Sequence, residues 1–533
     1  MKKVFLSIIL TFTTIAIFPN NIQLSNASLS GQVVANQTVQ VSFDLSWDNG
    51  WRTSSAVPLN WDAAWIFVKY RVGSGEWHHA KLSPTGYIEP PICSIDVASD
   101  SAGAFIYTSA IGNGSLSFPN VELQWAYGAN GVGDDDQVEI NVFAIEMVYI
   151  PAGPFYLGDG LDDTGRGQFR YATSVDPFYV SSEDSIQCGN DPGNLYANWQ
   201  LNLNGEIPSV FPKGFNAFYC MKYEISQEQF MEFLNTLTRD QQNFHTNTDI
   251  SGTSVTNYYV MVNAVSPSWH NAIRCNTTLP AAGPVTFFMD LDNDGIMNEA
   301  NDGGNHSVNF LRWVSLAAYL DWAAIRPMTE FEYEKTCRGP KYPVLGEYVW
   351  GTASIHSSVY TVSSAGLPNE TITNMGTNTG NAFYQGTRGS NFVIRCGIFA
   401  ASALNSSRQE TGSGYYGCME LSGSVYEQAV AVSFPAGRSY TGLNGDGELN
   451  SSGHATTDYW PGINDNSNVF ASNQAYDPGS GIGVTNTAGI CNVGGYANSN
   501  SIDDLRLSDR YNRGWSANSF SSPYGGRGCR TAD

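Results

Sequence analysis

Five short β-rich runs separated by turn residues occupy the chain between Ser28 and Ile145, and they constrain the fold more than any other feature. Runs of this length, rich in β-branched and aromatic residues and bounded by Gly, Asn, Asp or Ser, are typical of antiparallel strands. The pattern therefore predicts a β-sandwich domain over residues 28–145. The runs read VQVSFDLSW, AAWIFVKYRV, GAFIYTSA, NVELQWAY and DQVEINVFAI.

The N-terminal residues have the pattern of an export signal. Lys2 and Lys3 precede an apolar run from Val4 to Phe18, and small residues follow as far as Ala27. This run is shorter than the roughly 20 residues that a membrane-spanning helix needs, so we interpret residues 1–27 as a secretory signal peptide. No later segment is long and apolar enough to span a membrane. We therefore expect a secreted or surface-attached bacterial protein, with the periplasm as an alternative.

The charge and composition exclude several classes of protein. With 26 Lys and Arg against 49 Asp and Glu, the formal net charge is −23, which argues against a nucleic-acid partner. Aromatic residues make up 13% of the chain and hydrophobic residues 42%, enough to form large cores, so a mainly disordered chain is excluded. The 54 glycines indicate a structure rich in turns rather than a helical bundle.

From Glu146 to Asp533 the sequence predicts few helices and many loops. Ser226 and Gln229 have the spacing of a capping box, as do Thr329 and Glu332, and each pair predicts the start of a helix. The second of these helices is expected to end at Gly339, and a third is predicted over 315–324 from its apolar spacing. The expected fold class is therefore mostly β with α+β character.

Six motifs follow one another in this second part: EMVYIPAGPFYLGDG, FNAFYCMKYEISQEQFMEFL, WVSLAAYLDWAAIRPMTEFEYEKTCRG, EYVWG, GCMELSGSVYEQ and YGGRGCR. In this order they resemble the motifs of the formylglycine-generating enzyme, or sulfatase-modifying factor, family, and the resemblance covers residues 146–533. It implies a loop-rich variant of the C-type lectin fold, with a small twisted sheet, two main helices and loops that are often tied by calcium.

The resemblance also implies a pair of cysteines in the C-terminal segment that binds copper and oxidises a substrate cysteine. The matching stretch, Gly494–Trp515, contains no cysteine, and the nearest candidates are Cys491 and Cys529. The sequence also lacks C-x-x-C, H-x-x-x-H, H-E-x-x-H, G-x-S-x-G and P-loop motifs. We therefore expect no catalytic residues and no copper. An oxidoreductase that uses Cys491 or Cys529 on exported proteins is the alternative.

The segment MDLDNDGIMNEANDGG has the clearest chemical pattern in the chain. Asp290, Asp292 and Asp294 alternate and precede Gly295, as in the first half of a D-x-D-x-D-G calcium loop. Three carboxylates converge on one hard cation in such a loop, and calcium is the expected cofactor. The second half departs from the EF-hand pattern, and the residues that could complete the shell are Asn298, Glu299 and Asp302.

Two further acidic positions are weaker candidates for calcium. Asp446 and Glu448 alternate with glycines in LNGDGELNSSGHA, although turns of this kind form without metal. In SGSVYEQ, Glu427 is the position that the family resemblance assigns to a calcium ligand.

The function that these patterns favour is recognition or extracellular assembly. The C-terminal loops combine aromatic and amide side chains suited to stacking and hydrogen bonding, and the expected ligand is an extracellular protein or glycan. A structural subunit of an extracellular fibre or surface layer, formed by self-assembly, is the other alternative. The candidate ligand-binding residues are Tyr496, Asn498, Tyr511, Asn512, Trp515 and Tyr524.

Overall fold

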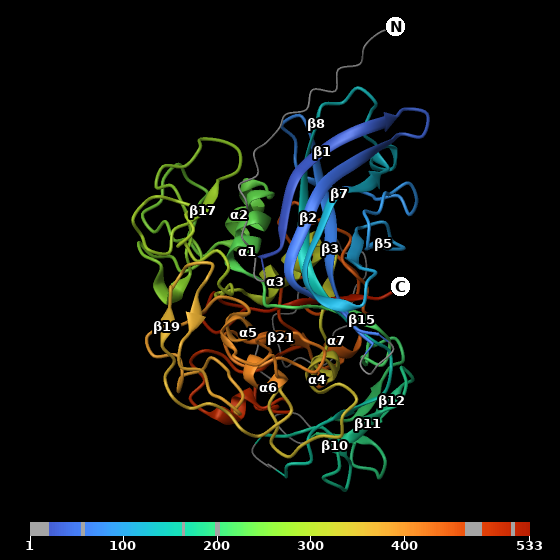
Figure 1. The fold of residues 1–533 in the computed structure, drawn as a ribbon, viewed down its shortest axis with the longest axis vertical. Coiled ribbons are helices and arrows are strands. Elements are labelled where there is room, and N and C mark those ends of the chain that lie inside the picture. Colours follow the sequence, from blue (N-terminus) through green and yellow to red (C-terminus); the bar gives the residue numbers. More distant parts are fainter. Residues whose placement is uncertain (1–20, 55–58, 163–165, 198–202, 464–481, 513–517) are drawn as a thin grey trace.

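The computed structural model describes residues 21–54, 59–162, 166–197, 203–463, 482–512 and 518–533, and Figure 1 shows their arrangement. Strands predominate over helices, which confirms the β-rich fold class. The apolar run Val4–Phe18 of the predicted signal peptide lies outside the described residues. The predicted end of that peptide at Ala27 lies within strand β1, where Gln23 already pairs with Ser46.

One eight-stranded antiparallel sheet organises the molecule, and a three-stranded sheet packs against part of it. The large sheet has the order β18-β23-β15-β8-β3-β6-β5, with β4 also paired to β3. Its strands are β18 (Arg326–Pro327), β23 (Gly528–Thr531), β15 (Phe218–Met221), β8 (Val138–Ile150), β3 (Asp62–Val72), β6 (Ala104–Thr108), β5 (Cys93–Val97) and β4 (His78–His79). The smaller sheet, in the order β1-β2-β7, comprises β1 (Gln23–Val33), β2 (Thr38–Arg52) and β7 (Gly112–Trp125).

Strand β3 is buried on both faces because its side chains alternate between two cores. Ile66 and Val68 belong to the core shared with Val41 and Phe43 of β2. The alternate side chains, Trp65 and Phe67, enter a second core with the helices. There the Trp65 indole N–H donates to the carbonyl oxygen of Ala323 at 2.9 Å. The sequence of a strand covered on both faces is a nearly continuous apolar run, as in AAWIFVKY.

Strand β8 passes through the boundary proposed between residues 145 and 146. It pairs with β3 from Val138 to Val148 and with β15 from Met147 to Ile150, so the two parts of the chain share one sheet. The blue and cyan strands of Figure 1 therefore continue into the rest of the molecule through this strand.

Seven α-helices are present in the described part of the chain: α1 (Gln227–Asn235), α2 (Arg239–His245), α3 (Trp313–Trp322), α4 (Glu330–Arg338), α5 (Ile398–Ser402), α6 (Arg408–Thr411) and α7 (Pro435–Arg438). The predicted capping boxes at Ser226 and Thr329 are both formed, and α4 ends at Gly339, whose φ of 65° favours glycine. The described ranges contain no helix with the length and apolar character needed to cross a bilayer.

The third predicted helix required correction. It was placed over 315–324 with one buried face, whereas α3 begins at Trp313, ends at Trp322 and is buried on every side. The apolar spacing was misleading because α3 lies between β3 and α1, where even Ser315 and Asp321 are buried.

The remaining elements are short and lie in the loop-rich body. The four-stranded sheet β10-β13-β12-β14 comprises β10 (Arg170–Tyr171), β13 (Leu195–Tyr196), β12 (Ile186–Cys188) and β14 (Gly205–Ile207). The two-stranded pairs are β9 (Phe155–Leu157) with β11 (Phe178–Val180), β16 (Ile273–Cys275) with β17 (Phe287–Met289), β19 (Val362–Ser363) with β20 (Thr371–Ile372), and β21 (Glu427–Val430) with β22 (Ile490–Val493). Single 3-10 turns are η2 (Tyr127–Asn130), η3 (Ser268–His270) and η4 (Ile502–Leu505).

Candidate metal centre and ligand surface

The acidic loop Asp290–Asp302 follows β17 and is closed by its own side chains. Asn298 exchanges two hydrogen bonds of 2.9 Å with the backbone of Met289, one through its side-chain oxygen and one through its amide N–H. The carboxylate of Asp302 accepts hydrogen bonds from the amides of Leu291, at 3.2 Å, and Glu299, at 2.7 Å. Gly295, with φ of 87°, occupies the turn. The loop is therefore ordered by local hydrogen bonds.

Three carboxylates converge at the start of this loop. Asp290, Asp292 and Asp294 each offer an oxygen, and these oxygens all lie within 4.8 Å of one another. Oxygens that bind one calcium ion at about 2.3–2.6 Å lie no more than about 5 Å apart, so this spacing fits a single cation. Among the described residues, this is the one group of three or more acidic, histidine or cysteine side chains with such spacing.

Asp290 supplies the buried side of the group. Its side chain is fully buried, and Arg274 forms an ion pair with Oδ2. Its Oδ1 is also buried and has no hydrogen-bond partner among the described residues. A buried carboxylate oxygen without a partner carries an energetic cost that a cation would remove. The Tyr259 hydroxyl donates to the backbone oxygen of Asp290 at 2.7 Å and fixes its position.

Asp292 and Asp294 form the exposed side, and both carboxylates also stabilise the turn. Asp292 accepts hydrogen bonds from the amide of Asp294 at 3.1 Å and from the Asn301 side chain at 2.5 Å. Asp294 accepts from the amide of Ile296 at 2.7 Å. Each donor uses one lone pair of an oxygen that retains others, so a carboxylate can accept from an amide and bind a hard cation at once.

The three residues proposed to complete the shell occupy different positions. Burial raises the pKa of Asp302 to about 6, and the charges of Asp290 and Asp292 contribute to that rise. Asn298 directs its side-chain oxygen to the backbone of Met289, and Glu299 is exposed. Neither Asp302 nor Glu299 belongs to the group of acids whose oxygens lie within 4.8 Å of one another.

The loop that contains Asp446 and Glu448 uses its acidic side chains for hydrogen bonds within the chain. Asp446 accepts from the amide of Glu448 at 2.9 Å, and Glu448 accepts from the amide of His79 at 2.7 Å and lies 3.5 Å from the His78 ring. Lys69 donates to the carbonyl oxygen of Gly447 at 2.5 Å. These contacts attach the loop to β3 and β4, and among the described residues Asp446 and Glu448 do not belong to a group of three metal-binding side chains.

Glu427 faces an arginine. Its Oε1 accepts from Nε of Arg527 at 2.5 Å, and both side chains are buried. Arg527 also donates to the backbone oxygens of Met221, Lys222 and Met419. A guanidinium therefore supplies the positive charge beside Glu427. Sequence reasoning missed this pair because its members are 100 residues apart.

Cys491 and Cys529 belong to one buried core cluster, but the direct neighbour of Cys529 is Cys220. Cys220 and Cys529 are paired across β15 and β23, and Cys220 also forms a side-chain hydrogen bond with Cys418. Burial raises the pKa of Cys220, but hydrogen bonds from Cys418 and Cys529 and the charge of Arg527 outweigh it and lower the pKa. All nine cysteines are buried, so a substrate thiol cannot reach one in this conformation.

Part of the predicted ligand surface gathers around Tyr426. The rings of Tyr496 and Tyr524 lie 4.8 and 6.3 Å from the ring of Tyr426, and Asn512 donates to the Tyr426 hydroxyl at 3.0 Å. Tyr496, Asn512 and Tyr524 are half-buried. They form an aromatic patch, defined here as Tyr426, Tyr496, Asn512 and Tyr524, that solvent reaches in part.

The other predicted members lie apart from this patch or outside the described residues. Asn498 accepts a hydrogen bond from Arg388 at 2.9 Å, and the exposed ring of Tyr511 stacks with Arg166 at 5.1 Å. Trp515 lies outside the described residues. The structure therefore brings together three of the six predicted ligand-binding residues.

Comparison with known proteins gives a partial and distant similarity. No family model matches the chain. Gingipain R1 and Lys-gingipain, both from Porphyromonas gingivalis, are each 22% identical to it over 267 residues. The similar region covers 44% of this chain and 15% of each relative, so the chain spans only a small part of the length of these proteins.

Proposed function

We propose that this chain is a secreted or surface-attached bacterial protein that uses a calcium-stabilised, sulfatase-modifying-factor-like domain for recognition or extracellular assembly. In this proposal an N-terminal β-sandwich supports a C-type-lectin-like body, and the protein carries no catalytic centre. The partial similarity to gingipains and the pattern of the first 27 residues are compatible with export.

The observation that carries the proposal is the convergence of Asp290, Asp292 and Asp294 around a buried oxygen that has no hydrogen-bond partner in the described ranges. A calcium ion held there would join the exposed turn to the buried Asp290 and thereby to β17. Loops braced in this way keep a binding surface in one conformation, which lowers the entropy lost when a ligand binds.

The recognition surface in this proposal is the aromatic patch around Tyr426. Its half-buried rings offer flat apolar faces, and its hydroxyl and amide groups offer hydrogen bonds, a combination that suits a glycan or a protein ligand. The buried state of every cysteine favours recognition over the oxidoreductase alternative.

The metal part is tested by calorimetric titration of the whole chain with calcium. We expect one site in the parent protein and none in the variant D292A/D294A, whereas D446A, a matched acidic change in the other loop, should keep it. Unchanged stoichiometry in D292A/D294A would refute the calcium site.

The recognition part is tested on arrays of extracellular glycans and matrix proteins. Binding that is lost in Y496A, and retained in Y342A, would support the aromatic patch, because Tyr342 is 64% exposed and belongs to a different surface. No binding to any arrayed glycan or protein, or equal binding by both variants, would count against it.

A further inference from the structure

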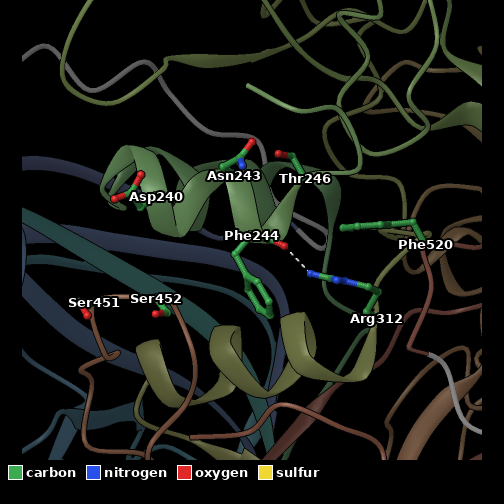
Figure 2. Close-up of a pocket in the computed structure, with 8 residues that line it drawn as sticks. All are labelled: Asp240, Asn243, Phe244, Thr246, Arg312, Ser451, Ser452 and Phe520. Carbon is green, nitrogen blue, oxygen red and sulfur yellow. Dashed lines mark hydrogen bonds between the residues drawn. The ribbon is translucent and has the colours of Figure 1, made fainter. Parts of the chain in front are cut away.

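A pocket of about 590 Å³ lies beside α2, and none of its lining residues belongs to the acidic loop or the aromatic patch. Figure 2 shows α2 along one side, Arg312 and Phe520 at one end, and Asp240 at the other. Its volume is in the range of pockets that hold small molecules. The lining residues are Asp240, Asn243, Phe244, Thr246, Arg312, Ser451, Ser452 and Phe520.

Arg312 is the positive charge of the pocket and has no carboxylate partner among the described residues. Its guanidinium lies between two rings, 4.7 Å from the centre of Phe244 and 4.2 Å from that of Phe520. Nη2 donates to the carbonyl oxygen of Phe244, the bond drawn in Figure 2, and Nε is buried with no hydrogen-bond partner in the described part of the chain. Burial lowers the pKa of Arg312 to about 10, and no acidic group counteracts it.

A guanidinium that lies between two aromatic rings can still donate its remaining N–H groups to a carboxylate. Most buried arginines of this chain already have such a partner: Arg274, Arg326, Arg338, Arg510, Arg527 and Arg530 each pair with an acidic side chain. Arg312 instead faces a pocket, so an anion from outside the chain can take that place.

The rest of the lining is polar and uncharged except for Asp240. The hydroxyls of Ser451 and Ser452 are exposed, and the amide of Asn243 adds a further polar group. Hydroxyl groups of a ligand can donate to Asp240 and exchange hydrogen bonds with these side chains. A second negative charge on the ligand would be repelled by Asp240 and by the net charge of −23.

The pocket is shaped before any ligand arrives, because the loop with Ser451 and Ser452 is attached to α2. Gln241 donates to the carbonyl oxygen of Asn450 at 2.9 Å, and the Nε2 of His245 lies 2.8 Å from the carbonyl oxygen of Gly453. The Asn450 side chain in turn accepts from the amide of Ser452 at 3.0 Å. Such preformed sites lose little entropy on binding.

We propose that this pocket binds a saccharide carrying a single carboxylate, of the uronic-acid class, with the carboxylate on Arg312 and the hydroxyls towards Asp240 and the serines. The site shares no residue with the aromatic patch or the acidic loop. Failure of this proposal would therefore leave the calcium-dependent recognition proposed above unaffected, and the reverse also holds.

The test is calorimetric or NMR titration of the whole chain with D-glucuronate, its neutral methyl ester and D-glucose. We expect millimolar or tighter binding of glucuronate and at least about tenfold weaker binding of the two neutral sugars, because a charge-assisted hydrogen-bond pair is lost. Equal binding of all three, or no binding of glucuronate, would overturn the proposal without any need for a variant.

Two variants then test whether glucuronate binds at Arg312. R312Q should weaken glucuronate binding at least about tenfold. R170Q is the matched control, because Arg170 loses the same charge but already pairs with Asp162 and stacks on Tyr196. Binding within twofold of the parent in a folded R312Q would refute the assignment.

Two further probes identify the source of the carboxylate. An oligosaccharide with a terminal glucuronate that binds more tightly than the monosaccharide would identify a glycan end as the natural ligand, whereas tighter binding of the free sugar would identify a monosaccharide. A tetra-aspartate peptide that binds more tightly than either, in an Arg312-dependent manner, would contradict the saccharide class.

Discussion

The acidic loop Asp290–Asp302 and the buried pair Glu427–Arg527 use the same kind of side chain in opposite ways. In the loop, oxygens of neighbouring acids lie within 4.8 Å of one another, and one buried oxygen has no hydrogen-bond partner among the residues that the structure describes. In the pair, Oε1 of Glu427 accepts from an arginine 100 residues away in sequence, and its Oε2 is buried with no hydrogen-bond partner among the described residues. The acids of the loop outnumber their one arginine partner, Arg274, and we propose that a cation balances them, whereas Glu427 is paired with Arg527.

The largest effect is expected when the internal partner is removed. R527M leaves Glu427 buried without its cation and should lower the free energy of unfolding by about 3–5 kcal/mol, measured by urea denaturation. R170M breaks an exposed pair, 3.3 Å from Asp162, and should cost less than about 1 kcal/mol. Similar losses in the two variants would remove the distinction between buried and exposed pairs.

Removal of calcium should have the next largest effect. A ligand that binds only the folded chain, at about 100 times its dissociation constant, adds about 2.7 kcal/mol of stability. We therefore expect a chelator to lower the melting temperature of the parent protein and to leave that of D292A/D294A unchanged. An equal chelator effect in both proteins would place any calcium elsewhere.

Glu420, a buried acid with no ion pair among the described residues, should make stability depend on pH. Burial raises the pKa of Glu420 to about 7. Between the unfolded pKa of about 4.3 and this folded value the folded chain binds more protons than the unfolded chain, so this group makes stability fall as pH rises through that window. E420Q should remove that fall and add at least about 2 kcal/mol at pH 8.

The measurement is urea unfolding of the parent and E420Q at several values between pH 4 and pH 8. E299Q, which changes an exposed acid of the loop, provides the control and should leave the pH profile unaltered. Parallel profiles for the parent and E420Q would show that Glu420 does not titrate in this window.

The smallest effect concerns the exposed side of the loop. D294N removes one of three neighbouring negative charges, so in the presence of chelator it should change stability by no more than about 0.5 kcal/mol. With calcium present the same change should weaken calcium binding, because a carboxylate ligand is lost. A large loss of stability in chelator would mean that Asp294 supports the fold directly.

Local features of the sequence predicted local structure well. The capping boxes at Ser226 and Thr329 and the convergence of three alternating aspartates each depend on residues within a few positions of one another. The burial of α3 on all sides was missed, because it depends on strands and helices distant in sequence that cover it.

Contacts between distant segments could not be predicted from one sequence. Nothing near Glu427 indicates that Arg527 lies opposite it, and nothing near Cys529 indicates that Cys220 is its strand partner. The Arg312 pocket was missed for the same reason, since it forms only when α2, the start of α3 and the residues around Ser451 and Phe520 meet. The one local signal was an arginine without an acidic neighbour in sequence, in NFLRWVS.

Strand β8 also limits how a chain of this kind can diversify. Because it bonds to β3 over most of its length and to β15 at its end, cutting the chain between residues 145 and 146 would leave a bare strand edge on each fragment. Exchange or excision of either half as an independent module would therefore favour aggregation. Variation is better tolerated in the long connections beyond Gly339, where few strands depend on the change.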